Sequence, residues 1–267
     1  MTFTPLPSYR RPPVSEVAAG ILFSDSIPGF QIPHIGKFWE KVKDEFPQSE
    51  HFTPIIVPGL LPKWLDSATG FPLPRIWLLS AKKDSLIQLQ GDCFFFNWRK
   101  SADTDVYPRY PAIIARFEDL LNRYLEFLKE ANLPAPEPRA CELSYINHIP
   151  QGAWWKTVED LGRILRDFCW CKDDGRFLPI PKNATWAATF DLPEKAGTLT
   201  ARLNQITRIS DSLPAIRLDL TAQGIGENKS IGGLRPWFDL SRDSIVRGFT
   251  DLTTPWAQKE LWEREDA

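Results

Sequence analysis

The chain has 267 residues, with 32 Lys and Arg against 34 Asp and Glu and a formal net charge of -2 at pH 7. Because the net charge is nearly zero, overall charge alone cannot draw this protein to nucleic acid or to anionic lipid. A local basic patch is still compatible with this balance. No apolar run reaches the roughly 18 residues of a membrane span, and the first residues lack the pattern of a secretory signal. Four scattered cysteines indicate no disulfide framework, so we expect a cytoplasmic protein without a membrane partner.

The first predicted elements are a strand and a short helix. Residues 14–23 alternate with a period of two, which is typical of a strand. Apolar residues at helical spacing predict an amphipathic helix over residues 35–46, and Pro47 ends it because proline cannot continue a helix. Repeated prolines then predict an extended or looped excursion over residues 47–74.

Three short strands and a long helix follow. Residues 75–80, 85–90 and 93–99 are separated by turn residues and predict an antiparallel meander. A broad apolar stripe from Tyr110 to Leu128 predicts a helix of about five turns. The proline-rich stretch at 133–139 has the composition of a linker.

The same order of elements then starts again. A strand is predicted at 141–149 and a helical pattern at 154–168. The helical C-terminus is predicted to begin at Ser241, as a cap, and to restart at Thr254. Between them lie three candidate strands: residues 185–191, 198–209 and 215–221.

This recurrence predicts a duplicated α+β chain. Its two tandem β-α-β-β-β-α repeats would occupy residues 1–132 and 140–267, joined by the proline-rich linker at 133–139. An offset of 126 aligns Glu16 with Glu142. Such a duplicated unit resembles the TATA-binding-protein-like architecture, which implies one curved antiparallel sheet backed by helices. That resemblance concerns the fold and shifts the expectation for nucleic-acid binding only slightly.

If helices cover one sheet face, the polar phase of the strands should line the open face. Arg99 ends a strand rich in phenylalanine. A ring of this strand could stack on single-stranded nucleic acid, or Phe95 could pack beneath the proline-rich excursion at 47–74. The predicted open face carries Gln88, Gln90, Thr200, Arg202, Asn204, Arg217 and Asp219. We take these residues, with Arg99, as the candidate binding residues.

Glu16, Glu142 and His148 are the candidate catalytic residues. The two carboxylates hold equivalent strand positions and could bind a cation or supply acid-base groups, or each could pair with an arginine such as Arg99 or Arg202. His148 is the best placed of the three histidines for acid-base work, but no serine elbow accompanies it. Whether the chain is an enzyme is left open, and a hydrolase or metal-dependent nuclease on these residues is the alternative to a non-catalytic protein.

The sequence predicts no metal site and no cofactor. Cys169 and Cys171 form a Cys-x-Cys pair, but no second Cys/His pair stands at zinc-finger spacing. The glycines at 224–233 fit neither the dinucleotide nor the phosphate-loop pattern.

Several motifs together resemble a sporadically distributed bacterial family of about this length with no assigned function. They are Pro12-Pro-Val-Ser-Glu-Val17, Gly36-Lys-Phe-Trp39, Phe96-Asn-Trp-Arg99, the strand from Cys141 to Ile149, and Leu252-Thr-Thr-Pro255 with Trp262. Sporadic distribution implies an accessory component of a defence or toxin-antitoxin system. We therefore expect a non-catalytic binding protein that engages a protein partner, or else nucleic acid, on its open sheet face. A weaker alternative is a small-molecule sensor with Trp and Phe rings around a ligand pocket.

Overall fold

The chain is an α+β protein whose strands form a nine-stranded antiparallel sheet. The computed structural model describes residues 5–54, 73–102, 104–152, 154–170, 175, 177–208 and 212–266. The strand order is β2-β3-β4-β5-β1-β6-β9-β8-β7, which places β1 and β6 next to each other. No helix in these ranges is long and apolar enough to cross a membrane.

Contacts divide the chain into two units, which we describe separately. Unit 1 comprises residues 1–15, 144–222 and 239–267, and unit 2 comprises residues 16–143 and 223–238. The strands β1, β6 and β9 and the helix α3 contribute residues to both. These units are defined by contacts and not by a repeat in the sequence. They therefore do not test the two predicted repeats, residues 1–132 and 140–267, which stay a prediction.

Most elements of unit 2 lie where the sequence predicts them. The expected meander and long helix are confirmed. The helix α1 begins earlier than expected because Pro33 fits its first turn. It also ends earlier, at Val42, so the prediction that it continues to Phe46 and is ended by Pro47 is wrong. The elements are β1 (Val14–Phe23), α1 (Ile32–Val42), β2 (Gln48–Phe52), β3 (Arg75–Leu79), β4 (Ser85–Gln90), β5 (Cys93–Arg99) and α2 (Arg109–Glu130).

The expected excursion at 47–74 is wrong at its start, where β2 pairs antiparallel with β3. The β2 residues are mostly polar and exposed, so their side chains give no alternating signal and backbone pairing alone defines the strand. Residues 55–72 of the predicted excursion lie outside the described residues.

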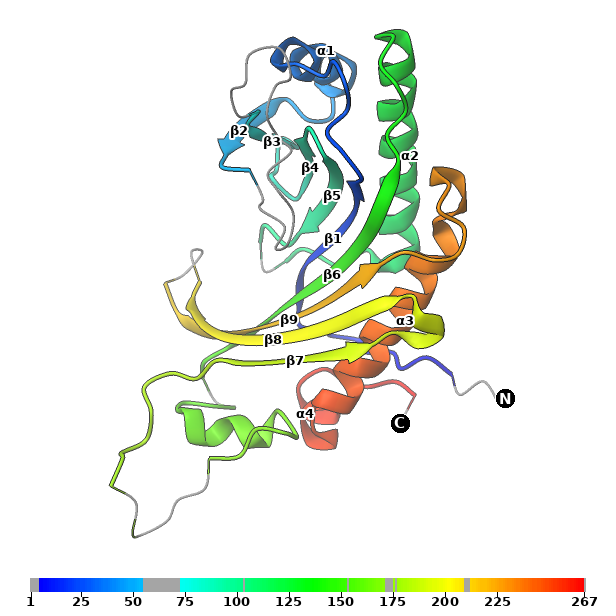
Figure 1. The fold of residues 1–267 in the computed structure, drawn as a ribbon. Coiled ribbons are helices and arrows are strands. Elements are labelled where there is room, and N and C mark those ends of the chain that lie inside the picture. The colour runs from blue at the N-terminus through cyan, green and yellow to red at the C-terminus, as the bar shows by residue number, and fades with distance from the viewer. Residues whose placement is uncertain are drawn as a thin grey trace. The chain divides into compact units, whose positions relative to one another are not determined.

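The core of unit 2 is aromatic. Phe94 of β5 stacks on Tyr124 of α2 with ring centroids 5.0 Å apart, and Phe38 of α1 meets Tyr124 at 5.1 Å. Phe117 of α2 also contacts Phe94, at 6.4 Å. The helices α1 and α2 therefore cover the sheet face that carries Phe94, and Figure 1 shows α2 running beside the strands of this unit.

Unit 1 holds the remaining strands and two further helices. Its elements, with those that continue into unit 2, are β6 (Pro138–Pro150), the 3-10 helix η1 (Val158–Arg163), β7 (Trp186–Asp191), η2 (Pro193–Lys195), β8 (Gly197–Thr207), β9 (Pro214–Gly224), α3 (Arg235–Leu252) and α4 (Pro255–Glu260). The 3-10 helix η3 (Ile231–Gly233) belongs to unit 2. Figure 1 shows α3 and α4 on one side of β7, β8 and β9.

Two helix predictions in the second half need correction. The helical pattern at 154–168 forms only η1, because Leu165 leaves the helix to make an antiparallel bridge with Thr253. The helix α3 begins six residues before Ser241, so the prediction that Ser241 caps its start is wrong. Ser241 is an interior residue of the helix, and its side chain is fully buried. The predicted cap at Thr254 is confirmed, since its Oγ1 accepts the Ala257 N–H at 3.2 Å.

Candidate binding face

In unit 1 the side chains of β8 alternate between buried and accessible from Leu199 to Asn204. Leu199, Ala201 and Leu203 are buried, and Leu199 lies against Gly248 of α3. Between them Thr200 and Asn204 are half-buried and Arg202 is exposed. The predicted polar phase of β8 therefore lies on the face opposite α3.

The neighbouring strand β9 continues this pattern. Ile216, Leu218 and Leu220 are buried, while Arg217 and Asp219 are half-buried. We call the resulting surface the polar face of unit 1 and define it by residues from β6, β8 and β9. They are His148, Thr200, Arg202, Asn204, Arg217 and Asp219.

Arg217 and Asp219 form an ion pair on this face. They are two residues apart on one strand, so their side chains point to the same side. The Arg217 Nε donates to both carboxylate oxygens of Asp219, at 2.8 and 2.9 Å. The pair holds the guanidinium group along the surface, with 39% of the Arg217 side chain still exposed.

His148 lies beside this ion pair. Burial and, next, the positive charge of Arg217 lower the pKa of His148 below its usual value of 6.5, although Asp219 opposes the shift. Its backbone N–H donates to the Pro13 carbonyl at 2.9 Å, which fixes the strand at this point. The lowered pKa of His148 favours the neutral imidazole at pH 7.

Arg202 is the most accessible cation of the polar face. Its side chain makes no ion pair or hydrogen bond within the described residues, so its charge is not neutralised locally. Among the six residues of the polar face, the positive charges of Arg202 and Arg217 therefore outnumber the single negative charge of Asp219. Along the edge of the sheet the hydroxyl groups of Thr189 and Thr200 lie 3.2 Å apart, which extends the polar character to β7.

In unit 2 the predicted open-face glutamines are buried. Gln88 and Gln90 are only 7% and 2% exposed, so their placement on an accessible face is wrong. Trp77 Nε1 donates to Gln88 Oε1 at 2.9 Å, and Gln88 Nε2 donates to Asn97 Oδ1 at 2.8 Å. These bonds satisfy the amide, which is why a glutamine can be buried here.

Each candidate glutamate accepts an amide hydrogen bond from the strand beside its own. Asn97 of β5 donates to Glu16, and Gln223 of β9 donates to Glu142 at 3.2 Å. The two bonds share the sequence separation of 81 residues. Both glutamates belong to unit 2, whereas His148 belongs to unit 1. The histidine therefore does not share the surroundings of the two glutamates.

Arg99 takes part in an aromatic cluster that the sequence did not reveal. Its guanidinium lies 5.4 Å from the Trp77 ring, and Arg75 lies 5.3 Å from the Phe52 ring. Phe52 and Trp77 are themselves 4.1 Å apart. The alternation Arg75-Ile-Trp77 in β3 was the available signal, but its partner Phe52 belongs to a strand that the sequence did not predict.

Phe95 packs inside unit 2. It forms a buried cluster with Leu22 and Cys93, and it covers Gly20 of the paired strand β1. The burial of this ring favours packing over stacking on nucleic acid, but residues 55–72, beneath which the sequence predicts that it packs, lie outside the described residues.

The described cysteines are Cys93, Cys141 and Cys169. Among the described residues no group of three or more His, Cys, Asp or Glu could hold a metal ion. Cys93 and Cys141 are buried, and burial raises the pKa of Cys93 well above its usual value and that of Cys141 to about 12, which makes both thiols unreactive. Cys169 is exposed, and Cys171 lies outside the described residues.

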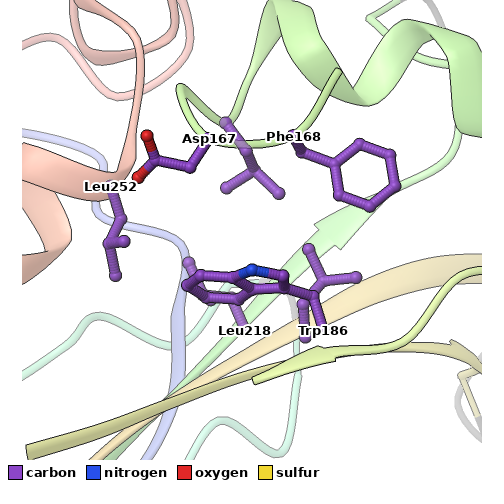
Figure 2. A pocket seen from close by; sticks show the side chains of 7 residues that line it. Asp167, Phe168, Trp186, Leu218 and Leu252 are labelled. Atoms are coloured by element: carbon purple, nitrogen blue, oxygen red, sulfur yellow. The ribbon is translucent and has the colours of Figure 1, made fainter. Parts of the chain in front are cut away.

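An apolar slot in unit 1 bears on the sensor alternative. Figure 2 shows the Trp186 indole on one side of the slot and Asp167 and Phe168 on the other. Its cavity volume is about 10 Å³, enough for about one water molecule. The slot therefore does not support a site for an organic ligand.

Comparison with protein-family models, with curated proteins and with solved structures finds no match for this chain. The geometry of its surfaces is thus the basis for a functional proposal.

Proposed function

We propose that this chain is a non-catalytic binding protein that holds an acidic segment of a protein partner on the polar face of unit 1. The observation that carries the proposal is the exposed guanidinium of Arg202 on β8, which makes no ion pair among the described residues, together with the partly exposed Arg217 on the neighbouring strand β9. A sheet face of hydroxyl, amide and guanidinium groups can satisfy the carboxylates and backbone of such a segment.

A protein partner fits this face better than single-stranded nucleic acid. Recognition of single strands depends on aromatic side chains that stack on the bases. The six residues that define the polar face include no Phe, Tyr or Trp. The aromatic cluster around Trp77 belongs to unit 2, where its rings already contact each other and the guanidinium groups of Arg75 and Arg99.

We also infer that the chain arose by duplication, with a fold like that of the TATA-binding protein. The offset of 126 that aligns Glu16 with Glu142 also aligns Asn97 with Gln223, which are the amide donors to these glutamates. A shared contact supports the repeat more strongly than the order of elements alone. An accessory role in bacterial defence or in a toxin-antitoxin system remains the expectation from the family resemblance.

Affinity isolation of the chain from its source cells tests the proposed function. Isolation is repeated after nuclease treatment, and bound proteins and nucleic acids are both quantified. We expect a protein at constant ratio to the chain, unchanged by nuclease and released by salt. Loss of all partners after nuclease treatment would show that the chain binds nucleic acid instead.

A further inference from the structure

The strand β7 is the last strand at the unit 1 end of the sheet, and its outer edge carries none of the usual guards. Among the described residues no strand pairs with it on the side away from β8, as Figure 1 shows. Natural proteins usually guard such an edge with a charged residue, a proline or a bulge, because its backbone groups can pair with another chain. From Trp186 to Phe190 the strand has no charged residue and no proline, and its register with β8 is unbroken. The edge can therefore receive a further strand.

The strand at the other end of the order, β2, is guarded by charge. Its residues are mostly polar and include Glu50, which accepts a hydrogen bond from Lys83 at 2.9 Å. A charged pair of this kind must be desolvated before another strand can join. The two end strands thus differ, and β7 is the one whose sequence permits pairing.

Every second residue of β7 directs its backbone N–H and C=O away from β8. The Leu192 N–H donates to the Gly197 carbonyl at 2.9 Å, and this pair continues the register of β7 with β8. Hydrogen-bonded pairs of an antiparallel ladder recur at every second residue, so the even-numbered residues of β7 bond to β8. The backbone groups of Ala187, Thr189 and Asp191 therefore point to the outer edge, and all three residues are exposed.

The side chains of β7 also leave an apolar ring at this edge. Trp186, Ala188 and Phe190 pair with buried residues of β8 and so lie on the side of the sheet that α3 covers. Trp186 and Ala188 are half-buried there, but Phe190 is 46% exposed. A strand added beside β7 would shield the Phe190 ring from water, which favours pairing.

We propose that a second copy of the chain supplies this strand and that the two β7 strands pair antiparallel about a two-fold axis at Ala188. An interface between identical chains is usually of this self-complementary kind. Trp186 of each copy then lies opposite Phe190 of the other, at the non-hydrogen-bonded positions where cross-strand side chains are closest. Aromatic pairs at such positions stabilise a ladder, and the symmetry provides two of them.

The same register satisfies the backbone and avoids a charge conflict. The outward groups of Ala187 in each copy meet those of Thr189 in the other as a hydrogen-bonded pair. Asp191, the only charged residue of β7, falls opposite Thr185, so like charges do not face each other. Opposed residues of antiparallel strands point to the same side, so the polar faces of both copies lie on one side of the joined sheet. The pairing therefore does not depend on the proposed function and does not block it.

Sedimentation equilibrium of the full chain, between about 1 and about 100 µM, tests the pairing. We expect a reversible dimer with a mass about twice the 30.6 kDa of one chain. A monomer at every concentration would leave this edge to a strand of another protein, and a mass that grows past the dimer would show open association. Either result would overturn the proposal.

Two variants change the edge without a direct effect on the bonds to β8. Ala187→Pro removes an outward N–H, and prolines are tolerated at such positions of edge strands. Phe190→Lys places a guarding lysine on the edge, and it also serves as the test if Ala187→Pro does not fold, as judged by circular dichroism. Each should weaken the dimer about tenfold or more. Phe177→Lys is the matched control, since Phe177 is 97% exposed and lies outside β7, and it should dimerise like the parent chain.

A cysteine at the axis tests the register. Ala188→Cys should form more disulfide-linked dimer on mild oxidation than the parent chain does, since the axis brings both copies of this residue together at the spacing that a disulfide needs. A dimer that both edge variants leave unchanged, or no additional disulfide in Ala188→Cys, would also overturn the proposal.

Discussion

Replacing Gly20 with alanine should destabilise unit 2 because the new methyl group would overlap the Phe95 ring. A Cβ built at Gly20 meets three atoms of that ring at distances too short for any real contact. Phe95 is 4% exposed, so the ring has no solvent into which to rotate. Overpacking of this kind costs about 1–3 kcal/mol in the free energy of unfolding.

Urea denaturation followed by circular dichroism measures this cost. Gly36→Ala is the matched control, since nothing lies within 4 Å of a Cβ at this exposed position in α1. Alanine favours helix over glycine, so the control should gain up to about 1 kcal/mol. Adding Phe95→Leu to Gly20→Ala should recover part of the loss, because the smaller side chain makes room. A Gly20→Ala chain as stable as its parent would refute this account of the packing.

Three further perturbations follow from the structure. His148→Gln should flatten the pH dependence of stability. Because the pKa of His148 is lowered in the folded chain, its contribution to stability is full above about pH 6.5 and is lost as pH drops through the folded pKa. Urea midpoints at about pH 7.5 and about pH 5.5 should therefore differ less in this variant than in the parent chain, and an equal difference would contradict the role of His148. Thr254→Ala removes the cap of α4 and should cost about 1–2 kcal/mol by thermal or urea unfolding, and an unchanged stability would contradict the capping role. Asn97→Leu breaks the bonds from Gln88 and to Glu16 and should cost about 1–3 kcal/mol, whereas a stabilised variant would show that this amide chain does not support the sheet.

Periodicity was sufficient for the long helix and for the strand phases, because one buried face imposes a clear pattern. The stripe from Tyr110 to Leu128 and the alternation of β8 both follow from burial against a neighbouring layer. The polar face at Arg202 and Arg217 was predictable for the same reason.

The errors arose where distant contacts override local pattern. The polar strand β2 is defined by backbone pairing with β3, and η1 is cut short by the bridge between Leu165 and Thr253. Gln88 is polar in sequence but buried in structure, because Trp77 and Asn97 complete its hydrogen bonds. No local rule identifies such partners, since they lie on other strands.

The paired contacts of Glu16 and Glu142 show what the structure adds. One matched glutamate at an offset of 126 was thin support for a repeat. The matching amide donors Asn97 and Gln223 could be recognised only after the hydrogen bonds were known.

The most direct test of the proposed function is a charge reversal on the polar face. Arg202→Glu changes an exposed side chain with no ion pair or hydrogen bond in the described chain, so it should leave folding intact. Lys259→Glu makes the same change of charge at an exposed position in α4, on the other side of the sheet. We predict that the isolated partner binds Arg202→Glu about tenfold more weakly than the parent chain and binds Lys259→Glu nearly unchanged. Equal affinities for the two variants would contradict the assignment of the binding face.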